Sequence, residues 1–113
     1  MALSGAQRVN AINAVAVAWS SSSSTRSLML GDGTLLAMVN VRVGTLAALK
    51  NSTNDDVTNV TAVRAHGTYL AAFATGVRAM LAAMTDLTAN HHVVALDGFM
   101  ATIETQATAL ASA

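Results

Sequence analysis

Apolar side chains recur with heptad spacing from residue 57 to residue 87, and this regularity constrains the fold more than any other feature of the sequence. Such a repeat places the side chains along one side of an α-helix. No proline interrupts the pattern. We therefore predict a long helix near residues 55–88. The positions of the repeat are Val63, Leu70, Val77 and Met84, with Phe73, Met80 and Leu87 beside them.

A polar segment precedes this helix and predicts where it begins. Residues 51–56 read NSTNDD, and side chains of this kind compete for backbone hydrogen bonds, so they favour caps and turns. Asn54 suits the N-cap position. The carboxylates of Asp55 and Asp56 suit the positive end of the helix dipole, which is consistent with a start at residue 55.

Two further helices are predicted, near residues 5–19 and 92–111. Ser4 followed three residues later by Gln7 is the capping-box pattern of a helix start. Residues 15–19 also alternate as in a strand, but the cap and the alanine content favour helix. The heptad phase shifts near Asn90, which indicates a turn before the last helix. That helix carries Leu96, Phe99, Ile103 and Leu110.

Residues 26–50 fit two structures. The GDG sequence at 31–33 suits a hairpin turn, and valines at 39, 41 and 43 alternate with polar residues as in a strand. Leu35, Val39 and Leu46 also form a helical stripe after a Thr34 cap. A lone hairpin is marginal in water, so we favour a helix near 34–50. The predicted fold is mainly α, a small bundle with one long helix. The alternative is α+β, with a β-hairpin at 26–43 before two C-terminal helices.

Five consecutive serines, at positions 20–24, follow the only tryptophan, Trp19. A serine run has little apolar surface to offset the entropy lost on ordering. We therefore predict one domain over residues 1–113, in which an N-terminal arm, 1–19, is connected by a flexible serine-rich segment, 20–27. The arm docks through Trp19 on its own domain or on a neighbouring chain.

Charge is scarce, and this restricts the possible partners. Charged residues make up 11% of the chain, against about 25% in a typical soluble domain. The formal net charge is zero and the six basic residues form no cluster, so we expect no nucleic-acid partner. The longest apolar stretch is interrupted by Asp32 and Arg42, and the first eight residues lack the order of a signal peptide. We therefore expect no membrane span.

The side of the long helix opposite its apolar repeat carries mostly alanine and threonine, where a surface helix usually carries Glu and Lys. Gly67 and Gly76 lie inside this helix although glycine costs about 1 kcal/mol there relative to alanine. Small residues allow close helix approach. We therefore predict that other subunits cover this helix. The interface candidates are Trp19, Thr61, Gly67, Thr68, Thr75, Gly76 and Ala79.

The sequence offers little for catalysis or for binding a cofactor. His91 and His92 are adjacent rather than three or four residues apart, so they do not form a helical metal-binding pair. His66 falls at a core position, where a hydrogen-bonded or register-setting polar residue is expected. The serine run lacks a G-x-S-x-G elbow. We predict no catalytic, cofactor or metal residues and a non-catalytic structural subunit that assembles with itself. The alternatives are a helical adaptor and, less favoured, a small metal-dependent enzyme using His91 and His92.

The first eight residues, MALSGAQR, resemble the start of small neck and head-completion proteins of tailed bacteriophages. The rest of the chain departs from that group, since it lacks their aromatic, proline and acidic content. The resemblance implies a virion component, located in the virion or the host cytoplasm, with other assembly subunits as further partners. It assigns no residue roles.

Overall fold

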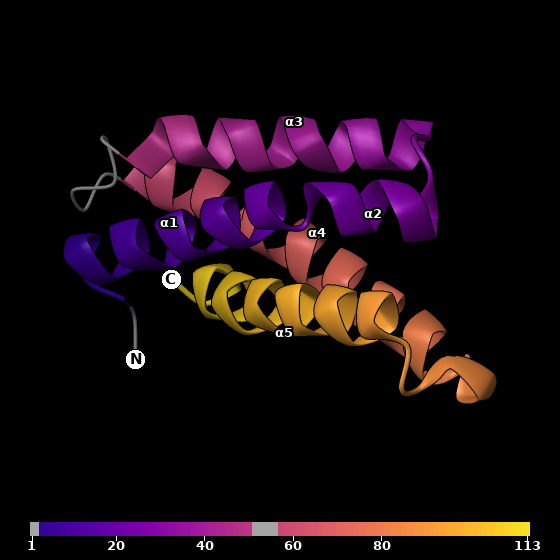
Figure 1. Ribbon diagram of the computed structural model, residues 1–113. Coiled ribbons are helices and arrows are strands. Elements are labelled where there is room, and N and C mark those ends of the chain that lie inside the picture. The colour runs from indigo at the N-terminus through magenta and orange to yellow at the C-terminus, as the bar shows by residue number, and fades with distance from the viewer. Residues whose placement is uncertain (1–2, 51–56) are drawn as a thin grey trace.

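Helices occupy nearly all of the chain that is described, residues 3–50 and 57–113, in a computed structural model (Figure 1). These residues contain no strand, so the prediction of a mainly α fold is confirmed. The elements are α1 (Gly5–Ser21), α2 (Ser23–Leu30), α3 (Thr34–Leu49), α4 (Val57–Ala82), the 3₁₀ helix η2 (Thr85–Leu87) and α5 (His91–Ala111).

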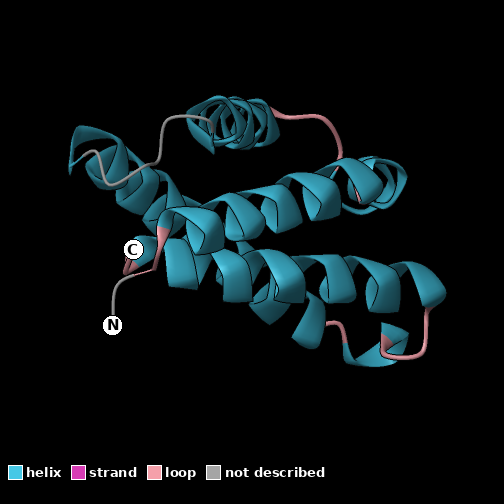
Figure 2. Cartoon of the chain, turned by 90° about the vertical axis from the view of Figure 1, so that its left-hand side faces the viewer, coloured by secondary structure: helices cyan, strands magenta, loops and turns pink. Residues whose placement is uncertain are grey.

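The most extensive contact between elements joins α4 and α5, which run antiparallel after the turn at η2 (Figure 1). On its other side α5 packs against α1, and α3 lies across α1 and α4. The short α2 continues the direction of α1 (Figure 1), packs against α5, and is joined to α3 by a loop (Figure 2). The molecule is elongated and flattened, with principal extents of 46 × 27 × 18 Å.

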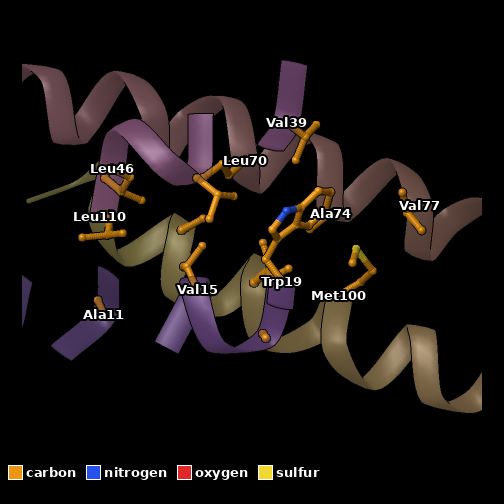
Figure 3. Close-up of a cluster of buried hydrophobic side chains, with 14 of the residues drawn as sticks. Ala11, Val15, Trp19, Val39, Leu46, Leu70, Ala74, Val77, Met100 and Leu110 are labelled. Atoms are coloured by element: carbon orange, nitrogen blue, oxygen red, sulfur yellow. The ribbon is translucent and has the colours of Figure 1, made fainter. Parts of the chain in front are cut away.

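All four longer helices contribute to one apolar core (Figure 3). α4 and α5 supply regular sets, because the buried residues of each helix follow one another at intervals of three or four. α3 supplies few, so one flank of the bundle is thinly covered. The largest fully buried side chains include Ile12, Leu46, Leu70, Leu96, Met100, Ile103 and Leu110.

The predicted helix starts are confirmed at two places. In α1 the backbone N–H of Ser4 donates to Gln7 Oε1 (2.8 Å) and the backbone N–H of Gln7 donates to Ser4 Oγ (3.2 Å), which completes the capping box. In α5 the Asn90 side chain accepts from the backbone N–H groups of His92 and Val93. The proposed cap at Asn54 and the first-turn carboxylates at 55 and 56 lie outside the described residues.

The β-hairpin considered for residues 26–43 is wrong, because α2 and α3 occupy that segment. Gly31, at φ 72°, ends α2 and lets the chain reverse between two helices rather than two strands. Val39, Val43 and Leu46 are buried at helical spacing on α3. The expected cap at Thr34 is also wrong, since Thr34 is the first helical residue and Gly33 is the N-cap.

The long helix ends earlier than expected, at Ala82 rather than near residue 88. The chain leaves the α conformation at Met84 and makes the 3₁₀ turn of η2, which carries it back along α4 as α5. Leu87, the last apolar position of the predicted repeat, is 43% exposed. The heptad pattern therefore extends past the residues that contact the core.

Residues 20–27 are helical instead of the flexible segment that we expected. Ser20 and Ser21 complete α1, Ser22 stands at the junction, and α2 begins at Ser23. Ser22 is buried, and its Oγ donates to the carbonyl of Trp19 (2.9 Å). Hydrogen bonding at the junction therefore orders a segment that has little apolar surface of its own.

Candidate functional site

A row of small side chains runs along the side of α4 that faces away from the core. Successive members lie three, four or seven residues apart, so they share one side of the helix, and each is exposed. We call this row the α4 outer face. It consists of Thr61, Ala65, Thr68, Ala72 and Ala79.

The two arginines of α4 both turn toward the C-terminal helix. Arg78 Nε donates to Asp97 Oδ1 (2.9 Å) and its Nη1 donates to Glu104 Oε1 (3.0 Å), while Arg64 Nε donates to the Ala113 carbonyl. Thr75 Oγ1 also donates to Glu104 (2.6 Å), and the hydrogen bonds from Thr75 and Arg78 lower the pKa of Glu104. The charges of α4 are thus gathered on its α5 side, and the outer face carries none.

The interface candidates predicted from the sequence separate into two groups. Trp19 and Gly67 lie inside the chain's own bundle. Trp19 is 4% exposed, and its ring meets Phe73 of α4 edge-on at a centroid distance of 6.0 Å. Gly67 faces the backbone of α5. The structure therefore gives both residues a contact within one chain.

The other candidates are exposed. Thr61, Thr68 and Ala79 belong to the α4 outer face, whereas Thr75 lies on its α5 edge and Gly76 on its α3 edge. Gly76 has open space around it, since a Cβ added at this position would meet no atom within 4 Å. The tight crossing expected at both glycines therefore occurs at Gly67 and is absent at Gly76 within the described chain.

An apolar groove of about 580 Å³ opens beside Gly76, between α4 and the turn that joins α2 to α3. Sequence reasoning missed this groove. Leu35 was expected in a core stripe of α3, but it is 57% exposed because the groove lies beneath it. One feature of the sequence could have indicated the groove: α3 has more large apolar residues than a single partner helix can cover. The main lining side chains are Leu30, Leu35, Leu36, Phe73, Val77 and Met80.

Polar groups gather near the end of the groove formed by Tyr69. The Arg42 guanidinium of α3 lies over the Tyr69 ring, with its central carbon 4.3 Å from the ring centroid. His66 lies one turn before Tyr69, and its Nδ1 is buried with no hydrogen-bond partner in the described part of the chain. The Nδ1 of His66 therefore does not supply the hydrogen bond that was one of the two expectations for this position.

His66 gives the fold a pH dependence. Burial, and secondly the charge of Arg42, lower the pKa of His66 below its ordinary 6.5. The folded state therefore binds fewer protons than the unfolded chain, so we expect the free energy of unfolding to fall as the pH drops below about 6.5. His66→Gln removes this part of the pH dependence in urea titrations, whereas His91→Gln, at an exposed position, retains it. Equal slopes for the two variants would contradict the assignment.

The paired histidines form no metal site with their neighbours. The rings of His91 and His92 lie with centroids 3.9 Å apart at the start of α5. Over residues 3–50 and 57–113, no three His, Cys, Asp or Glu side chains come together as metal ligands.

Among the helices described, none has the length and apolar character needed to cross a membrane. No protein-family model, curated protein or solved structure matches the chain significantly.

Proposed function

We propose that this chain is a non-catalytic structural subunit that assembles with copies of itself through the α4 outer face. The observation that carries the proposal is the absence of charge from this exposed row of alanine and threonine, with Arg64 and Arg78 both held on the α5 side. An isolated surface helix ordinarily displays long charged side chains at such positions.

Helix packing supplies the mechanism. Small side chains let two helix axes approach to the short end of the usual range of about 8–10 Å. The area buried contributes about 25 cal/mol per Å² of apolar surface, against the cost of lost rotational and translational freedom. A symmetric assembly repeats this gain at every copy. The resemblance of residues 1–8 supports a virion as the setting, with other virion subunits as additional partners.

Thr68→Glu tests this surface. A carboxylate at the centre of the α4 outer face would be buried without a partner, so we expect the assembly to dissociate, with a loss of at least about tenfold in association constant per interface. Thr105→Glu is the matched control, because Thr105 is an exposed threonine within α5. Sedimentation velocity at micromolar concentration gives the readout.

The same experiment separates the proposal from its rival. A wild-type chain that sediments as a monomer would overturn self-assembly. The apolar groove favours the alternative of a helical adaptor, since an amphipathic helix can lay its apolar side into such a groove. A monomer that forms a defined complex with a helical partner, and loses it on a groove substitution rather than on Thr68→Glu, would establish that alternative.

A further inference from the structure

We propose that the apolar groove between α3 and α4 binds a single long-chain aliphatic carboxylate, with its hydrocarbon tail along Phe73 and Met80 and its head group at Arg42. This site borders the α4 outer face, with which it shares Ala72, and it does not depend on the proposed assembly.

The volume and the lining of the groove fit a hydrocarbon tail. Its volume of about 580 Å³ lies within the range of small-molecule sites, roughly 300–1,000 Å³. Leu35 and Met80, which both line the groove, remain 57% and 39% exposed. An unbranched hydrocarbon would cover both side chains without demanding a hydrogen bond from walls that are almost entirely apolar.

The charge of Arg42 fits an anionic head group. No carboxylate in the described part of the chain pairs with Arg42, in contrast to Arg78, which binds two. Arg42 lines a separate hollow on α3 and not the groove itself, but its guanidinium lies over the ring of Tyr69, which does line the groove. The unpartnered Nδ1 of His66 lies close to the same arginine. An anion with an apolar tail complements this arrangement, and a guanidinium binds a carboxylate in bidentate fashion.

The chain contains its own reporter for this site. Trp19 is the only tryptophan, and its ring contacts Phe73, whose side chain forms part of the groove wall. Only the Phe73 ring would separate a brominated dodecanoate in the groove from Trp19, and bromine at such short range would quench the Trp19 fluorescence. We expect saturable quenching below the concentration at which dodecanoate aggregates, with roughly fourfold tighter binding for each added methylene.

Two pairs of variants test the assignment on the full chain. Arg42→Gln should weaken binding of brominated dodecanoate about tenfold and leave that of the neutral brominated dodecanol unchanged. Lys50→Gln removes the same charge at the C-cap of α3 and should change neither. Gly76→Leu should abolish binding by filling the groove, since a Cβ there meets nothing within 4 Å. Gly98→Leu, at an exposed glycine of α5 with equally open surroundings, should bind normally.

Each other outcome counts against the site. Quenching that does not saturate, that is equal for the acid and the alcohol, or that survives Gly76→Leu would overturn it. Quenching seen only with anionic phospholipid vesicles would mean that the chain binds a membrane surface and not a single molecule, and this result would also overturn the proposal. Sedimentation of Gly76→Leu distinguishes the two proposals, because that variant should lose the ligand and still assemble.

Discussion

Gly67→Ala will destabilise the fold by about 2–3 kcal/mol. A Cβ at this position would lie 2.7 Å from the backbone nitrogen of Ala111, 2.8 Å from the carbonyl oxygen of Ala107 and 2.9 Å from the Cβ of Leu110. Two of these atoms belong to the α5 backbone, so no rotamer change relieves the overlap. The helices α4 and α5 must separate, which loosens the largest contact in the bundle.

Gly76→Ala provides the matched control, nine residues further along the same helix. The added methyl group meets nothing within 4 Å, so only helix propensity changes and the free energy of unfolding rises by up to about 1 kcal/mol. Urea titrations followed by circular dichroism measure both variants, and their difference isolates the steric cost at Gly67. If the two variants had equal stability, α4 and α5 could not cross as closely as described.

The paired glycines illustrate how far sequence reasoning reaches. It identified both as candidates for close helix approach, because glycine in a helix interior requires a compensating reason. It could not distinguish them, since the partner backbone that makes Gly67 necessary comes from residues 107–111, some forty positions later. A local sequence pattern shows how residues are spaced along one helix. It does not show which other helix packs against them, because that depends on the tertiary structure.

The heptad repeat predicted the buried residues correctly where two helices pack together, and it failed to do so beyond that contact. Val63, Leu70 and Val77 are buried, as predicted. Leu87 of the second set is exposed because α4 ends at Ala82 and Leu87 lies in η2. Within α4, Met80 is more exposed than Phe73, because seven residues advance a straight helix by about 20° less than two full turns. That drift carries Met80 out of the core and onto the groove. Predicting the groove required the position of α3, which the ambiguous segment 26–50 did not reveal.

Trp19→Ala is expected to lower the free energy of unfolding by about 3–5 kcal/mol, the range for deleting a large buried aromatic side chain. The ring packs in the common core (Figure 3). It also contacts Phe73 of α4 edge-on. Its Nε1–H donates to Asn40 Oδ1 of α3 (3.1 Å), and the Arg26 guanidinium of α2 lies 3.6 Å over it. One side chain of α1 thus joins three other helices, and chemical denaturation of the variant measures the combined loss.

The serine run supplies a matched pair that tests the same junction without a large cavity. Ser22 is buried, donates to the Trp19 carbonyl and accepts from Arg26 Nε (2.8 Å), so Ser22→Ala should cost about 1–2 kcal/mol. Ser21→Ala, one residue earlier and exposed, should change stability by less than about 0.5 kcal/mol. Equal effects would mean that 20–27 is the flexible segment its composition suggests. A large difference would establish that a single hydroxyl, bonded to both Trp19 and Arg26, orders the turn between α1 and α2.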